Sequence, residues 1–142
     1  MKFKTMTVIA ALFVTMTAYA AESTGQAPAM TCQLTSNIFE NGKEVTRVLD
    51  QKAIPANPMP GGSLLGSLEF RNTDIYVTAA LNRENTPNGD VLTAFVFGVS
   101  PKQTERQSLG SAEYEMPVSR VVVETNAPVA EYGNLRLTCC SQ

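Results

Sequence analysis

The sequence predicts an all-β fold, a single antiparallel β-sandwich of about eight strands with an Ig-like or jelly-roll-like architecture. From residue 30 onward, short segments of alternating apolar and polar residues are separated by clusters of Gly, Pro, Asn and Asp. No stretch beyond residue 20 keeps a helical period. A single sheet of this length would leave an apolar face in water, so two packed sheets are expected, with a closed barrel as the alternative.

The first predicted hairpin covers residues 31–49. Residues 31–39 alternate in character and form its first strand. Asn41-Gly42 follows, the pair that tight hairpin turns prefer because both residues tolerate positive φ. Residues 44–49 return as the second strand, and residues 48–54 ("VLDQKAI") are compatible with a short helical turn.

A second hairpin is predicted from residues 64–70 and 74–82, joined by Asn72-Thr73. The second strand carries apolar residues at positions 75, 77, 79 and 81. The residues expected on one face of the first strand are Leu64, Gly66, Leu68 and Phe70.

A predicted loop at residues 83–90 ("RENTPNGD") leads to the most apolar strand, residues 91–99. Both faces of that strand are apolar, which predicts a central position in its sheet. Strands at residues 108–115, 120–125 and 133–140 complete the set.

The oxygen-bearing side chains of the predicted loop at residues 83–90 suit Ca²⁺, but turn geometry already explains the Asn, Pro and Gly of this loop. We therefore predict no metal and no cofactor.

The N-terminus predicts a secretory signal peptide at residues 1–20. Lys2 and Lys4 precede a short apolar run, which ends at the small-residue pattern around Ala20. We expect cleavage after Ala20, with Ala21 as the next choice, then a flexible leader at residues 21–29 and the β-sandwich domain at residues 30–142. The expected location is periplasmic or secreted, on the pattern of bacterial export, without membrane insertion after cleavage.

Charge excludes one class of partner. The net charge of −2 becomes −4 when Lys2 and Lys4 are removed, because nine basic residues then face thirteen acidic ones. A mildly acidic chain without a basic cluster is unsuited to nucleic acid. The remaining chain, about 120 residues, is the size of one domain.

Three cysteines predict one disulfide in an oxidising compartment. Side chains alternate along a strand, so Cys32 shares the apolar face of the first strand, and Cys139 shares that of the last. We predict a Cys32–Cys139 bond, with Cys32–Cys140 and a vicinal Cys139–Cys140 bond as alternatives. Cys140 is then left as an idle thiol or as the link of a disulfide-bonded homodimer.

The sequence disfavours most catalytic mechanisms, because it contains no histidine and none of the common nucleotide-binding or hydrolase motifs. Carboxylate chemistry remains open, because a glycosidase needs only two acids that face each other across a cleft, and the sequence contains candidate acids. The candidate acids are Glu84, Asp90, Glu113, Glu115 and Glu124. We predict no enzymatic activity and keep a carboxylate-based hydrolase as an alternative.

The candidate binding loop is Asn57, Pro58, Met59, Pro60 and Gly61, within the Pro-rich and Gly-rich segment 55–63. Prolines stiffen it, and a rigid loop binds at lower entropic cost. A simple crossover between sheets is the competing interpretation. These five residues are similar to the N-P-T-T-G loop of the chagasin-like cysteine-protease inhibitors, whose other two binding loops have no counterpart here. The resemblance implies a secreted protease inhibitor.

The resulting functional prediction is a non-enzymatic binding or structural module of the bacterial envelope. Its expected partner is a protein or a glycan. The protease inhibitor and the carboxylate-based hydrolase are the two alternatives.

Overall fold

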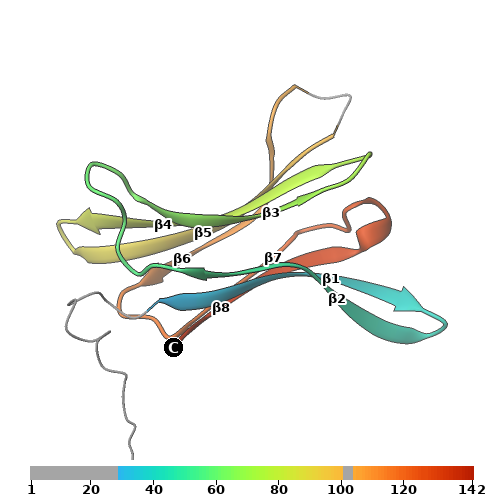
Figure 1. The fold of residues 1–142 in the computed structure, drawn as a ribbon, viewed down its shortest axis with the longest axis horizontal. Helices are drawn as coiled ribbons and strands as arrows, with labels where there is room; N and C mark the ends of the chain where they lie inside the picture. Colours follow the sequence, from blue (N-terminus) through green and yellow to red (C-terminus); the bar gives the residue numbers. More distant parts are fainter. Residues whose placement is uncertain (1–28, 101–103) are drawn as a thin grey trace, which may run out of the picture.

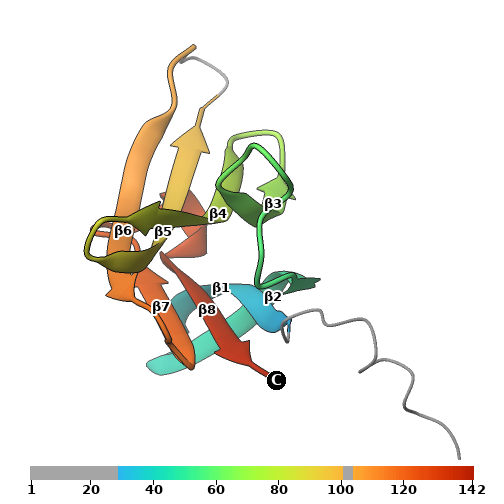
Figure 2. The ribbon, with the colours of Figure 1, turned by 90° about the vertical axis from the view of Figure 1, so that its left-hand side faces the viewer.

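The computed structural model describes residues 29–100 and 104–142, which form two antiparallel four-stranded sheets packed face to face (Figures 1 and 2). This is the predicted β-sandwich. The predicted signal peptide and residues 21–28 of the predicted leader lie outside the described residues. Within the described part of the chain, no helix has the length and apolar character needed to cross a membrane.

The two sheets differ in which parts of the chain they use. The terminal sheet, in the order β2-β1-β8-β7, contains β1 (Met30–Glu40), β2 (Lys43–Ile54), β7 (Arg120–Glu124) and β8 (Asn134–Ser141). The central sheet, in the order β3-β4-β5-β6, contains β3 (Leu64–Arg71), β4 (Tyr76–Thr86), β5 (Gly89–Val99) and β6 (Gln107–Glu115). A short 3₁₀ helix, η2 (Ala130–Tyr132), precedes β8. As predicted, the apolar strand β5 lies inside its sheet.

The first and last strands pair side by side along the middle of the terminal sheet. Their register places Cys32 directly opposite Cys139 and Leu34 opposite Leu137, with all four side chains fully buried. The two cysteines form a disulfide that joins positions 107 residues apart in the sequence. Strand pairing and the covalent bond therefore fix both ends of the domain together.

The core lies between the sheets and consists of the inward-facing aliphatic side chains of both. Alternation along each strand brings every second residue into it. The largest fully buried aliphatic side chains are Leu34, Ile54, Leu68, Val77, Leu81, Leu92, Val96, Val121, Leu135 and Leu137.

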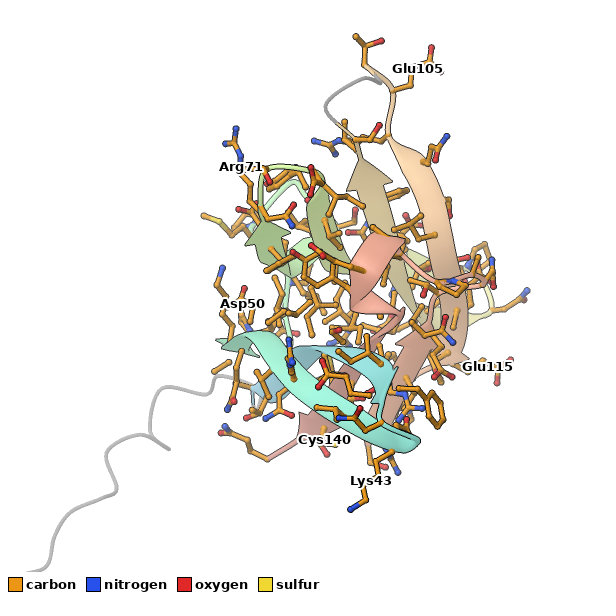
Figure 3. All side chains as sticks on the ribbon, turned by 90° about the vertical axis from the view of Figure 1, so that its right-hand side faces the viewer. Lys43, Asp50, Arg71, Glu105, Glu115 and Cys140 are labelled. Carbon is orange, nitrogen blue, oxygen red and sulfur yellow. A yellow bond between two sulfur atoms is a disulfide. The ribbon has the colours of Figure 1, made fainter. Side chains whose placement is uncertain are left out.

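Side chains bridge both long flanks of the sandwich. On the flank formed by β2 and β3, the Oδ2 of Asp50, which is labelled in Figure 3, accepts a hydrogen bond from the Glu69 N–H at 2.9 Å. The Lys52 Nζ donates to the Ser67 carbonyl at 3.2 Å. On the other flank, the Tyr114 hydroxyl of β6 bonds both backbone groups of Val122 in β7. These contacts satisfy backbone groups of Ser67, Glu69 and Val122 that could otherwise pair with another strand.

The β1–β2 hairpin confirms the Asn41-Gly42 turn, since both residues have positive φ, 53° and 77°. The predicted helical turn at residues 48–54 is wrong, because β2 continues as a strand to Ile54, which is buried opposite Met30. A register shift leaves Leu49 without a cross-strand partner, between Val48 and Asp50. The bulge interrupts the alternation of apolar and polar residues, so the sequence pattern does not predict that the strand continues.

A second bulge, at the start of β3, corrects the predicted face of Leu64. The pairing with β4 shifts between Leu64 and Gly66, so Leu65 turns inward instead. Leu65 is 8% exposed and Leu64 is 52% exposed. The remaining predicted members of that face, Leu68 and Phe70, do contribute to the core.

The predicted loop at residues 83–90 is also wrong, because it is a hairpin. β4 continues to Thr86, and β5 begins at Gly89, so the turn consists of Pro87 and Asn88. The ends of both strands run past the apolar core, where their side chains need not be apolar. β4 and β5 therefore stay paired beyond the residues whose apolar–polar alternation identifies them as strands.

Candidate functional site

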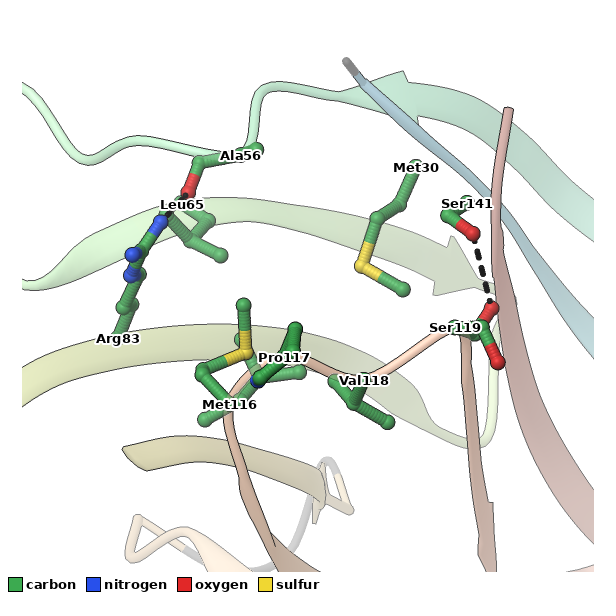
Figure 4. A pocket seen from close by; sticks show the side chains of 10 residues that line it. Met30, Ala56, Leu65, Arg83, Met116, Pro117, Val118, Ser119 and Ser141 are labelled. Carbon is green, nitrogen blue, oxygen red and sulfur yellow. Dashed lines mark hydrogen bonds between the residues drawn. The ribbon is translucent and has the colours of Figure 1, made fainter. Parts of the chain in front are cut away.

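The candidate site is an apolar pocket at the end of the sandwich where the C-terminus lies (Figures 1 and 4). Both sheets contribute to it, since Met30 begins β1, Leu65 lies in β3 and Leu92 lies in β5. The β6–β7 connection forms another wall. The lining residues are Met30, Ala56, Leu65, Arg83, Leu92, Met116, Pro117, Val118, Ser119 and Ser141.

The pocket has the size and the lining of a small-ligand site. Its volume is about 470 Å³, within the ~300–1,000 Å³ typical of such sites. Met30 and Met116 approach it from opposite walls (Figure 4), and methionine side chains adapt readily to irregular apolar shapes. The site can therefore receive an apolar group of a ligand.

Arg83 lies on the rim, where it ties together three segments of the chain. Its Nη1 donates to the Ala56 carbonyl at 2.9 Å and to the Asn57 Oδ1 at 3.0 Å. Its Nε and Nη2 donate to the Asp90 Oδ2 at 3.1 and 2.5 Å. The guanidinium thereby fastens the β2–β3 connection to the β4–β5 hairpin.

Asp90 is held as a carboxylate. The hydrogen bond from Arg83 lowers the pKa of Asp90 below its ordinary value of 3.8, and a second hydrogen bond, from the Asn85 Nδ2 at 2.6 Å, lowers that pKa further. Both carboxylate oxygens of Asp90 thus have partners. No group of three or more metal-ligating side chains occurs within residues 29–100 and 104–142.

The candidate binding loop is part of the crossover from β2 to β3, and Ala56, the residue before it, lines the pocket. Asn57 is bound by Arg83, so the loop is anchored at its first residue. At the other end the Gly62 N–H donates to the Met59 carbonyl at 3.1 Å, around the positive φ of Gly61. Met59 is 80% exposed at the tip.

The cysteines divide as the strand parity predicts. Cys32 and Cys139 form the buried disulfide, and Cys140 is a free, exposed thiol. Cys140 lies on the outer side of the terminal sheet (Figure 3), opposite Thr31 of β1 and Arg120 of β7. Its side chain lies on the opposite face of β8 from Cys139, which is buried in the core.

None of the candidate carboxylates lines the apolar pocket, and Glu84 and Glu115 flank Val91 on the open outer face of the central sheet. Glu84, Glu113 and Glu115 are exposed on the central sheet, Asp90 is bound to Arg83, and Glu124 pairs with Arg136 in the terminal sheet. Acids do gather in a separate hollow between the β1–β2 hairpin and the segment that joins β7 to β8, lined in part by Glu40, Glu44, Glu124 and Glu131. Two of these four are in ion pairs with arginines, Glu40 with Arg47 and Glu124 with Arg136.

Sequence reasoning missed the pocket and its rim. The lining comes from seven separate stretches of the chain, and only the topology brings them together. The Arg83–Asp90 pair had a usable signal, since Pro87-Asn88-Gly89 could have been interpreted as a hairpin turn that brings the flanking polar residues close.

No protein-family model, curated protein or solved structure matches this chain.

Proposed function

We propose that the protein is an exported binding module of the bacterial envelope that holds an apolar group of its ligand in the pocket at the end of the sandwich. The pocket itself carries this proposal, because a concave, mostly apolar site between two sheets is the usual form of a small-ligand site. The disulfide and the signal-peptide pattern support an oxidising, extracytoplasmic location.

The lining favours an apolar group over a sugar. A glycan presents hydroxyl groups that each need a hydrogen-bond partner when buried. The pocket offers mainly the side chains of Met30, Leu65, Leu92 and Met116. Its serines are at one edge, where the Ser141 Oγ donates to the Ser119 carbonyl at 3.3 Å (Figure 4). An aliphatic chain needs no hydrogen-bond partner and can pack against these apolar side chains.

An uncharged fluorescent probe, N-phenyl-1-naphthylamine, tests the pocket. The protein is expressed from its full sequence and titrated with the probe. Val118→Trp places a large ring at a half-buried position of the lining, and we expect it to weaken probe binding at least about tenfold, which corresponds to ~1.4 kcal/mol.

The matched control is Val48→Trp, at a position of β2 that is 56% exposed and outside the pocket. It should leave probe affinity unchanged. Equal binding of the probe to wild type and to Val118→Trp, or no binding to any of the three proteins, would reject the pocket as the site.

The anchored loop supports a second candidate function, the protease inhibitor. Arg83 fixes Asn57, and Met59 projects into solvent, so the segment has the rigidity that an inhibitory loop needs. Replacing residues 57–61 with Gly-Ser repeats should abolish inhibition of a papain-like cysteine protease. Wild-type protein that leaves the protease fully active would end this hypothesis.

A further inference from the structure

The rim of the pocket carries a charge that is already neutralised. Arg83 is the one charged side chain among the described lining residues. Four of the five guanidinium N–H donors are used, two by Asp90 and two by Ala56 and Asn57. The Arg83 and Asp90 side chains are only 24% and 27% exposed, so neither pairs freely with an incoming ion.

We propose that the ligand of this pocket is a small, uncharged aliphatic molecule, and that the Arg83–Asp90 pair excludes its anionic analogues. This inference rests on the proposed function, since it names the chemistry of the group held in the same pocket. The pair acts as a specificity device on the rim.

The exclusion follows from the geometry of the pair. A ligand carboxylate can approach the Arg83 guanidinium only near the Asp90 carboxylate, so it meets a like charge. To replace Asp90 it would leave that carboxylate half-buried with one partner, Asn85, which is costly. A ligand ammonium would meet Arg83 in the same way. Specificity of this kind depends on a repulsive element as well as on an attractive one.

An uncharged head group meets no such penalty. The alternative acceptors and donors on the rim are neutral, the Ser119 carbonyl and the Ser141 hydroxyl. The Ser141 hydroxyl can exchange its 3.3 Å bond to the Ser119 carbonyl for one to a ligand hydroxyl or to water, while that carbonyl keeps the 2.9 Å bond from the Ser141 N–H. The apolar chain is then free to occupy the space between Met30 and Met116.

Competition between three eight-carbon ligands tests the inference. 1-Octanol, octanoate and octylamine displace N-phenyl-1-naphthylamine from the wild-type protein at neutral pH, where the last two are charged. We expect octanol to compete at least about tenfold more strongly than either ion. This arm needs no variant, so it does not depend on whether a mutant folds.

Asp90→Asn tests the role of the pair. It keeps the shape of the side chain and frees the Nε and Nη2 face of Arg83 for a carboxylate. The ratio of octanoate to octanol affinity should then rise at least about tenfold. The matched control is Glu40→Gln, which breaks the 2.8 Å ion pair with Arg47 on the β1–β2 hairpin and should leave the ratio unchanged.

The outcomes separate the two proposals. If octanoate equals octanol in the wild type, or if Asp90→Asn leaves the ratio unchanged, the inference is wrong and the apolar pocket stands. If the probe does not bind, or if none of the three ligands displaces it, the proposed function fails together with the inference. Probe binding that is lost as the protein concentration rises would make a second copy of the chain the occupant, which also overturns the inference.

Discussion

The Tyr114 hydroxyl bridges the sandwich flank to Val122, donating to its carbonyl at 2.7 Å and accepting from its N–H at 3.0 Å. Tyr114 lies in β6 of the central sheet and Val122 in β7 of the terminal sheet, so a single side chain connects the two edges. Edge strands with free backbone groups recruit other strands. The bridge gives hydrogen-bond partners to the backbone N–H and carbonyl of Val122, in the middle of β7, while the other edge of β7 pairs with β8.

Removing this hydroxyl should destabilise the domain. Tyr114→Phe leaves the Val122 N–H and carbonyl without their partner in a partly buried position, and the expected cost is about 1–3 kcal/mol. Urea denaturation measures the change. Tyr76→Phe, on the outer face of β4, is the matched control and should change the free energy of unfolding by less than about 0.5 kcal/mol. Equal effects of both substitutions would contradict a role for the bridge.

The same flank depends on a close backbone approach at Gly110. A Cβ built at Gly110 would lie 2.5 Å from the Glu124 carbonyl oxygen, too close for any real contact. Gly110→Ala must push β6 away from the end of β7, and we expect a loss of about 1–3 kcal/mol. Gly62→Ala is the control, since its Cβ would have an ordinary 3.7 Å contact. Denaturation curves that coincide for the two variants would show that the flank is looser than described.

Strand parity predicted the architecture and the disulfide, because one side chain in two faces the core wherever pairing is regular. Cys32, Cys139 and the inward leucines of β1 and β8 follow this rule. It fails at Leu64, where a bulge shifts the pairing by one residue, and a second bulge at Leu49 interrupts the alternation of β2. A bulge depends on the partner strand, which a local pattern does not contain.

The pocket was beyond prediction for a related reason. Met30, Met116 and Val118 look like ordinary core residues in the sequence, and only the connection between sheets makes them line a cavity. Residues 57–61 do lie in a connection between strands, as their prolines and glycines indicate, and their role in binding stays a prediction. Its link to the pocket through Arg83 was missed, because residues 83–90 were interpreted as a loop and not as a hairpin.

Loss of the disulfide should have the largest effect on stability. The double change Cys32→Ser and Cys139→Ser opens a link between positions 107 residues apart, and chain entropy gives an expected cost of up to about 4–5 kcal/mol. Cys140→Ser, at an exposed position, is the control and should leave stability unchanged.

The assigned pairing also predicts the reactivity of the thiols. A thiol reagent should label one cysteine per native chain, and none in Cys140→Ser. Labelling that persists in Cys140→Ser would contradict the assigned pairing.

The Arg83–Asp90 pair makes a pH-dependent contribution to stability. The pKa of Asp90 is lowered from 3.8 in the folded protein, so folding favours the ionised carboxylate. Its contribution is fully present above pH 3.8 and is lost as the pH falls through the lower, folded-state pKa. Asp90→Asn should therefore be less stable than wild type at neutral pH, and the two unfolding free energies should converge in acid. Glu40→Gln, which removes a more exposed ion pair, should show a smaller difference at neutral pH. Urea denaturation across a pH series measures both differences. A gap for Asp90→Asn that stays constant well below pH 3.8 would mean that the pair does not stabilise the fold through its charge.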